Sequence, residues 1–127
     1  MTKILIAEDE GDIRELICLT LEISGFQVVE AANGAEAVNL ARTEAPDLVL
    51  MDVRMPLMTG LDACVAIKAD RKLKNIPVVF LSAKGQDSEV QMGLQAGAQE
   101  YLVKPFSPEL LIKRIHVLLE RTKSKKT

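Results

Sequence analysis

Five short apolar runs, each bounded by polar or turn residues, constrain the fold of this chain more than any other feature. They are rich in Ile, Val and Leu, and apolar positions do not alternate with polar ones. Runs of this kind are typical of parallel strands in a sheet that is covered on both faces, because an exposed face would need polar residues at every second position. The expected strands are Ile4–Ala7, Phe26–Val29, Leu48–Met51, Ile76–Leu81 and Tyr101–Val103.

The segments between these runs have helical periodicity, and their ends carry helix-stop and helix-start residues. Gly25, Pro46 and Gly97 lie where the first, second and fourth helices should end, and Ser107-Pro108-Glu109 suits the start of the fifth. The order is therefore five βα units. With right-handed crossovers, such units form one doubly wound α/β domain, a parallel five-stranded sheet with helices on both faces.

Charge and hydropathy exclude several classes of protein. Sixteen basic and eighteen acidic residues leave a net charge of −2, which does not favour nucleic acid or an anionic membrane. No apolar run approaches the roughly 18 residues of a membrane span, so we expect a cytoplasmic chain without membrane insertion. We expect the domain to cover residues 1–121 and residues 122–127 to form a basic C-terminal tail or the start of a linker. The basic cluster consists of Arg121, Lys123, Lys125 and Lys126.

Polar side chains that could bind a ligand or take part in a reaction lie at the ends of four of the five expected strands. Glu8 and Asp9 follow the first strand, and Asp52, Ser82 and Lys104 lie at the ends of the third, fourth and fifth. The carboxyl ends of parallel strands meet at one edge of the sheet, which is where ligands bind in open α/β folds. We therefore expect these five side chains to lie close together.

Taken singly, each of these residues also has a purely structural explanation. Asp9 or Glu8 could precede a helix, Asp52 could form an Asx turn, Ser82 could cap a turn, and Lys104 could be a surface cation. Taken together they are harder to explain, because three neighbouring carboxylates repel by roughly 3 to 4 kcal/mol per pair at an effective dielectric near 20. A hard divalent cation offsets this repulsion, and Mg²⁺ typically uses one or two carboxylates and leaves room for phosphate oxygens.

These considerations favour a magnesium-dependent phosphoryl site in which Asp52 is the acceptor, since carboxylates form aspartyl-phosphates and Asp52 lies on the central strand. Glu8 and Asp9 would then hold the metal. Lys104 would meet the phosphoryl oxygens, and Ser82 would donate a hydrogen bond to one of them.

With these residues in place, the sequence closely resembles the receiver domain of two-component response regulators, the CheY-like superfamily. The resemblance extends from Lys3 to about Arg121. The family motifs occur in order and spacing as IAEDE, LVLMDVRMPLMTG, VVFLSA and YLVKPF.

The resemblance implies a flavodoxin-like strand order of 2-1-3-4-5 and phosphorylation of Asp52 by the phosphohistidine of a sensor histidine kinase, a phosphotransfer protein or a small phosphodonor. It further implies Mg²⁺, with Mn²⁺ as a substitute, bound by Glu8, Asp9, Asp52 and the backbone carbonyl of Arg54. The domain would be a phospho-switch in signalling and not an enzyme with a substrate of its own.

Other family features fall on the last third of the chain. Phosphorylation would draw Ser82 toward the phosphate and let Tyr101 turn inward, although Tyr101 also suits an ordinary core position. The bond before Pro105 would be cis in the family.

Output would be read on the face made by the fourth helix, the fifth strand and the fifth helix, which would bind a downstream protein, an effector domain or a second copy. The fifth helix has a broad apolar arc, which is explained equally well by a partner or by a wide buried face. This arc comprises Leu110, Leu111, Ile112, Ile115, Val117, Leu118 and Leu119.

Two positively charged residues near the site lie at positions where the family has no constant residue. Arg54 and Lys84 each lie two residues beyond a site residue, where the family varies and the side chain influences the lifetime of the aspartyl-phosphate. We expect both to affect that lifetime, in a direction that the sequence leaves open.

Three alternatives compete with the phospho-switch. A phosphatase of the haloacid dehalogenase type also uses an Asp nucleophile with Mg²⁺ and Lys, but it usually has a second Asp where this chain has Arg54. A docking pseudo-receiver would not need competent residues at all five positions. Rossmann-type nucleotide binding is disfavoured because EDEGDI replaces a glycine-rich phosphate loop after the first strand.

Overall fold

A computed structural model of the chain describes residues 2–53, 55, 57–82, 87–104 and 107–126. Strands and helices alternate along these residues without exception. The elements are β1 (Lys3–Ala7), α1 (Gly11–Ile23), β2 (Gln27–Ala31), α2 (Gly34–Glu44), β3 (Leu48–Asp52), α3 (Gly60–Ala69), β4 (Val78–Ser82), α4 (Asp87–Gln95), β5 (Glu100–Val103) and α5 (Pro108–Lys126).

The five strands form one sheet in the order β2-β1-β3-β4-β5, and every neighbouring pair is parallel. This confirms the predicted doubly wound fold and its strand order. In the register of the two central strands, Ala7 of β1 pairs with Met51 of β3. The residues that follow, Glu8 and Asp52, therefore leave the sheet side by side.

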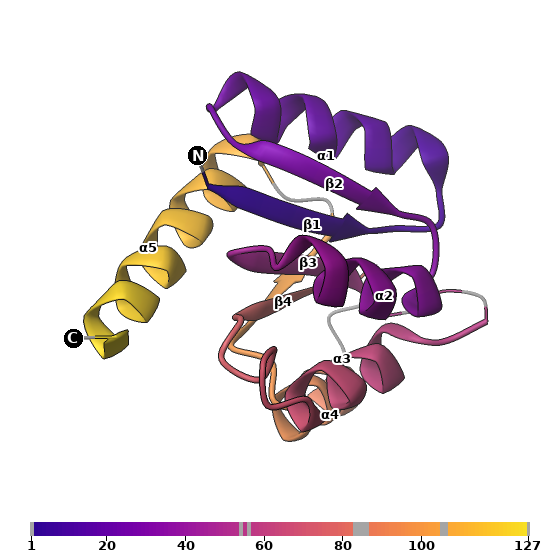
Figure 1. Cartoon of the computed structure of the whole chain (residues 1–127). Coiled ribbons are helices and arrows are strands. Elements are labelled where there is room, and N and C mark those ends of the chain that lie inside the picture. Colours follow the sequence, from indigo (N-terminus) through magenta and orange to yellow (C-terminus); the bar gives the residue numbers. More distant parts are fainter. Residues whose placement is uncertain (1, 54, 56, 83–86, 105–106, 127) are drawn as a thin grey trace.

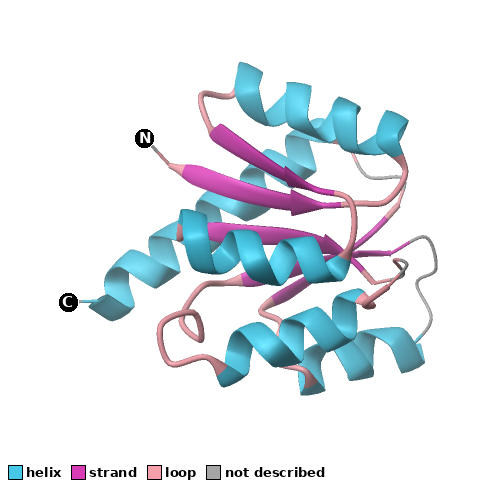
Figure 2. Ribbon diagram, turned by 45° about the vertical axis from the view of Figure 1, so that its right-hand side comes forward, coloured by secondary structure: helices cyan, strands magenta, loops and turns pink. Residues whose placement is uncertain are grey.

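Helices cover both faces of the sheet (Figures 1 and 2). On one face, Ile4 and Ile6 of β1 pack in a buried cluster with residues of α1 and α5. On the other face, Leu5 and Ala7 pack with residues of α2 and α3. The fourth helix lies on this second face, where a Cβ atom added to Gly93 would come within 2.9 Å of the Phe80 ring. The two cores hold the central strands rigidly between helices.

The first edge strand, β2, differs from the prediction of a strand buried on both faces. It runs from Gln27 to Ala31 and not from Phe26 to Val29. Gln27 and Glu30 are exposed and Ala31 is buried. An edge strand has only one neighbour, so the helices cover it less completely than the centre of the sheet.

The fourth strand also begins later than predicted, at Val78. Ile76 belongs to the preceding turn, where its N–H donates a hydrogen bond to the carbonyl of Leu73 at 2.9 Å. Pro77 has no N–H, although its carbonyl accepts a hydrogen bond from Val49 at 3.0 Å.

The predicted helix boundaries agree with the structure. Gly25 and Gly97 have φ angles of 93° and 100°, a conformation that favours glycine after a helix. Ser107 caps α5, since its Oγ accepts a hydrogen bond from the N–H of Leu110 at 3.1 Å. Residues 122–126 continue α5, and the domain boundary at residue 121 stays a prediction. Within the described part of the chain, no helix combines the length and apolar character needed to cross a bilayer.

Candidate functional site

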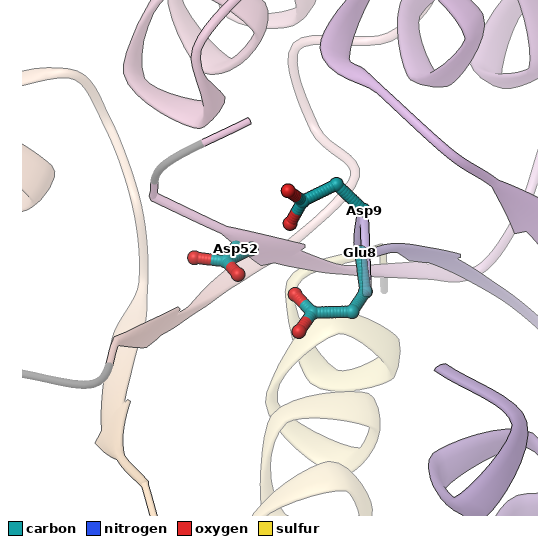
Figure 3. Close-up of side chains that lie close together, drawn as sticks. All are labelled: Glu8, Asp9 and Asp52. Atoms are coloured by element: carbon teal, nitrogen blue, oxygen red, sulfur yellow. The ribbon is translucent and has the colours of Figure 1, made fainter. Parts of the chain in front are cut away.

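Three carboxylates gather where β1 and β3 end (Figure 3). Glu8 follows β1 directly and is fully buried, Asp9 is exposed, and Asp52 is the half-buried last residue of β3. One oxygen from each carboxylate lies within 4.8 Å of an oxygen of the other two. The structure thus brings together the acidic residues that the sequence predicted, because the register of β1 and β3 places their ends side by side.

A single ammonium group lies against two of these carboxylates. Lys104 follows β5, and its Nζ is 2.8 Å from Oε1 of Glu8 and 3.2 Å from Oδ2 of Asp52. The backbone N–H of Lys104 donates a hydrogen bond of 2.7 Å to the carbonyl of Ser82, which fixes the end of β5 against β4. The predicted lysine is therefore at the site, and it bridges the carboxyl ends of β1 and β3.

The charges of this cluster shift each other's protonation equilibria. Burial first, and then the hydrogen bond and negative charge of Asp52, raise the pKa of Glu8 to about 8, although Lys104 acts to lower it. Burial would lower the pKa of Lys104, but its hydrogen bonds and the negative charges of Glu8 and Asp52 outweigh this, so the pKa of Lys104 is raised. The cluster therefore favours the charged form of Lys104 and disfavours the charged form of Glu8.

The donor set suits a hard divalent cation. All three side chains offer only oxygen atoms, which are the ligands that Mg²⁺ prefers. Oε2 of Glu8 is buried and has no hydrogen-bond partner among the described residues. Such an atom is costly unless a ligand satisfies it. Glu8, Asp9 and Asp52 can therefore hold a metal ion, and its binding would relieve an observed defect.

Two further predicted residues, Ser82 and Tyr101, lie on β4 and β5. Ser82 ends β4 at the same edge, with its side chain buried. Tyr101 lies on β5 opposite Phe80, half-buried against the core. The predictions for Arg54, Lys84 and Pro105 lie outside the described residues. The only histidine in the sequence, His116, is an exposed residue of α5, and the centroid of its ring lies 5.5 Å from that of Phe26.

Sequence reasoning gave no role to two residues that touch the site. A Cβ atom at Gly60, the first residue of α3, would lie 2.0 Å from the carbonyl oxygen of Asp52, so only glycine lets the helix start this close to the acceptor strand. Arg14 of α1 donates a hydrogen bond of 2.6 Å to the carbonyl of Glu8. Gly60 lies within a motif already noted, whereas nothing in the sequence points to the contact of Arg14.

Residues 4–116 match the family model of the response regulator receiver domain. The chain belongs to this family. The receiver domain is 42% identical over 119 residues to the phosphate regulon transcriptional regulatory protein PhoB of Klebsiella pneumoniae, covering 94% of this chain and 52% of the relative. It is 37% identical to the alkaline phosphatase synthesis transcriptional regulatory protein PhoP of Bacillus subtilis, covering 94% of this chain and 49% of that protein. The chain thus spans about half the length of these relatives.

Solved structures agree with the family. The chemotaxis protein CheY4 of Vibrio cholerae superposes with a TM-score of 0.89 at 35% identity, covering 93% of this receiver domain and 98% of CheY4. A CheY-like receiver domain protein of Methanospirillum hungatei superposes with a TM-score of 0.91 at 25% identity, covering 98% of both chains. A receiver domain is a signalling domain of two-component systems. The family match gives no support to the phosphatase, pseudo-receiver or nucleotide-binding alternatives.

Proposed function

We propose that this receiver domain is a phospho-switch in which Asp52 accepts a phosphoryl group with the help of Mg²⁺. The observation that carries the proposal is the cluster of Glu8, Asp9 and Asp52 within 4.8 Å, with Lys104 as the cation against two of them. The arrangement is poorly suited to a purely structural role, since one buried oxygen of Glu8 has no hydrogen-bond partner among the described residues. Bound Mg²⁺ and a phosphoryl group would complete it.

The chemistry assigned to the chain's own residues is simple. An oxygen of the Asp52 carboxylate forms a bond to phosphorus while the bond between phosphorus and the donor breaks, and the donor keeps the electron pair. The ammonium of Lys104, already 3.2 Å from Oδ2 of Asp52, turns toward the phosphoryl oxygens. Ser82, at the neighbouring strand end, donates its hydroxyl to the same group, and Tyr101 turns inward with it.

Glu8, Asp9 and Asp52 would hold the metal, together with the backbone carbonyl of Arg54, and Mn²⁺ would substitute for Mg²⁺. A bound ion would supply positive charge that stabilises the negative charge of the phosphoryl oxygens. Without the ion, Lys104 compensates part of the negative charge of Glu8 and Asp52, which allows the two carboxylates to lie close together.

The proposed phosphodonor is the phosphohistidine of a sensor histidine kinase or phosphotransfer protein, or a small acyl phosphate. The transfer would take place in the cytoplasm. The domain would catalyse only its own phosphorylation and slow dephosphorylation. The family relationship to transcriptional regulators of about twice its length supports an output through an effector domain or partner protein.

The proposed output surface is the α4-β5-α5 face. Several apolar side chains on it are exposed: Met92, Leu94, Val103 and Leu110 are 40% to 49% exposed. Three residues of the broad arc of α5 are buried, namely Leu111, Ile115 and Leu118. Core packing thus uses part of the arc, and the exposed remainder supports binding of a partner or of a second copy after phosphorylation.

Arg54 and Lys84 are proposed to set the lifetime of the aspartyl-phosphate from the mouth of the site. Arg54→Ala and Lys84→Ala variants should each change the rate at which phosphorylated protein loses its phosphoryl group. Measurement of that rate by intact mass checks both, and unchanged rates would remove the idea.

The proposed function is tested by incubation with acetyl phosphate and MgCl₂, followed by intact mass and by hydrolysis of a generic phosphomonoester. We expect a gain of one phosphoryl group that requires MgCl₂ and is lost in Asp52→Asn, with no turnover of the ester. Ester turnover without an adduct would support a phosphatase instead. Absence of both signals would support a docking module.

A further inference from the structure

Arg14 occupies a position between the acidic edge and the edge strand of the sheet. Its side chain is 23% exposed and makes two directed contacts. Nη1 donates a hydrogen bond of 2.6 Å to the backbone carbonyl of Glu8, and Nε donates one of 3.2 Å to Oε1 of Glu30 on β2. One guanidinium group thus links α1, the residue after β1, and β2.

The carbonyl that Arg14 holds belongs to the peptide unit that joins Glu8 to Asp9. A peptide unit is planar and includes the Cα atoms of both residues, so its orientation sets the directions in which both side chains leave the chain. The other backbone group of Glu8 is also held, because its N–H donates to the carbonyl of Ala31 at 3.1 Å. The turn after β1 is therefore pinned on both sides of Glu8.

We propose that Arg14 is a positioning residue that holds the Glu8–Asp9 peptide so that both carboxylates converge with Asp52 on the metal. This inference rests on the proposed function, since it assigns a residue that supports the metal-binding carboxylates without touching the metal. Glu30 completes the device, because its carboxylate fixes the second arm of the guanidinium group. Groups that orient ligands in this way commonly change metal affinity about tenfold or more when they are removed.

A purely electrostatic role for Arg14 leads to the opposite expectation. A positive charge beside three carboxylates disfavours a bound cation, so its removal alone would strengthen Mg²⁺ binding. Arg14→Lys separates the two roles, because lysine keeps the charge but lacks the planar fork that reaches two acceptors. Glu30→Gln and Glu30→Ala test the positioning role at the partner of Arg14. Glutamine keeps an acceptor oxygen for the guanidinium group, and alanine does not.

The matched control is a second arginine–carboxylate pair far from the acidic edge. Arg42, in the last turn of α2, lies with its Nε 3.5 Å from Oδ2 of Asp70. Arg42→Lys makes the same chemical change as Arg14→Lys and leaves the site alone.

The test titrates MgCl₂ into the metal-free full chain and its variants and follows amide chemical shifts by NMR, with thermal unfolding as a check on folding. We expect the Kd for Mg²⁺ to rise about tenfold in Arg14→Lys and about threefold to fivefold in Glu30→Ala, and to stay near the unaltered value in Glu30→Gln and Arg42→Lys. If Arg14→Lys does not fold, the Glu30 pair carries the same test.

Equal Kd values in all variants would overturn the inference while the proposed function stands. An unchanged Kd in Arg14→Lys together with tighter binding in Arg14→Met would also overturn it, in favour of a charge effect. If the unaltered chain does not bind Mg²⁺, the metal-dependent function fails and the inference fails with it.

Discussion

The two edges of the sheet differ in the groups that surround a lysine, as Lys104 and Lys68 show. At the carboxyl edge, Lys104 faces two carboxylates, and one buried oxygen of Glu8 has no partner among the described residues. At the amino edge, the ammonium of Lys68 donates to neutral oxygens at 2.7 Å, 3.1 Å and 3.4 Å, those of Ile76, Lys74 and Gln99.

The amino edge is organised for folding. Gln99 accepts from the N–H of Val78 at 2.8 Å with the same oxygen that meets Lys68, so the side chains complete the start of β4. Lys3, at the start of β1, pairs with Glu44 at 3.3 Å. These contacts satisfy polar groups that strand ends would otherwise leave open.

At the carboxyl edge, one oxygen of the buried Glu8 carboxyl group has no hydrogen-bond partner among the described residues. A buried polar atom without a partner costs on the order of 1 to 3 kcal/mol. The difference between the edges indicates that polar groups at the amino edge serve stability, whereas those at the carboxyl edge are kept for a ligand.

The largest expected difference comes from replacing each lysine by methionine. Lys104→Met leaves two facing carboxylates without their cation, so we expect it to lower the unfolding free energy by about 2 to 3 kcal/mol without metal and to abolish stable phosphorylation. Lys68→Met removes a donor to neutral oxygens and should cost about 1 kcal/mol. Urea unfolding with and without MgCl₂ measures both.

Magnesium distinguishes the two variants. Addition of MgCl₂ should restore much of the stability of Lys104→Met, because the ion replaces the missing positive charge, and should do little for Lys68→Met. Equal losses of stability in both variants, with no response of either to MgCl₂, would contradict the proposed difference between the two edges.

The next effect is a pH dependence that belongs to the carboxyl edge. The pKa of Glu8 is about 8 in the fold, against 4.5 for the ordinary side chain, so the folded state binds the proton more tightly. Between these values the unfolded state has lost a proton that the folded state keeps, and stability without metal must fall as pH rises.

The slope is at most about 1.4 kcal/mol per pH unit, and it should flatten in Glu8→Gln, which cannot titrate. Urea unfolding from pH 5 to pH 8.5 in EDTA checks this. A slope that survives in Glu8→Gln would assign the titration to another group.

The smallest expected effect concerns backbone strain, which both edges carry. Leu57, after β3, and Ala45, after α2, have positive φ angles of 67° and 45°. Leu57 is 87% exposed, so its side chain contributes little packing. Asparagine tolerates this conformation better, and we expect Leu57→Asn to gain about 1 kcal/mol and Ala45→Asn about 0.5 kcal/mol in thermal unfolding. A loss of stability in Leu57→Asn would mean that the leucine side chain makes stabilising contacts in spite of its high exposure.

Local patterns were sufficient to predict much of the architecture. Gly25 and Gly97 identify helix ends because their backbone conformation is costly for other residues. The continuous apolar runs identify the central strands because helices cover both faces there. The same rule was wrong for the bounds and burial of β2, since its place at the edge depends on the strand order, which no local run of residues encodes.

The acidic cluster was predictable for a similar reason. Parallel strands end at a common edge, so Glu8, Asp52 and Lys104 could be brought together before their distances were known. The contact of Arg14 with the carbonyl of Glu8 could not be predicted, because it depends on how α1 packs beside β2. Nor could the sequence show that one buried oxygen of Glu8 has no partner in the described part of the chain.

The central claim is tested most directly by locating the phosphoryl group. Protein treated with acetyl phosphate and MgCl₂ is reduced with borohydride, which converts an acyl phosphate to an alcohol, and the product is mapped by peptide mass spectrometry. We expect the residue at position 52 to be converted to homoserine, in a reaction that requires MgCl₂. Conversion at Glu8 or Asp9, or no conversion at all, would contradict the assignment of Asp52 as the acceptor.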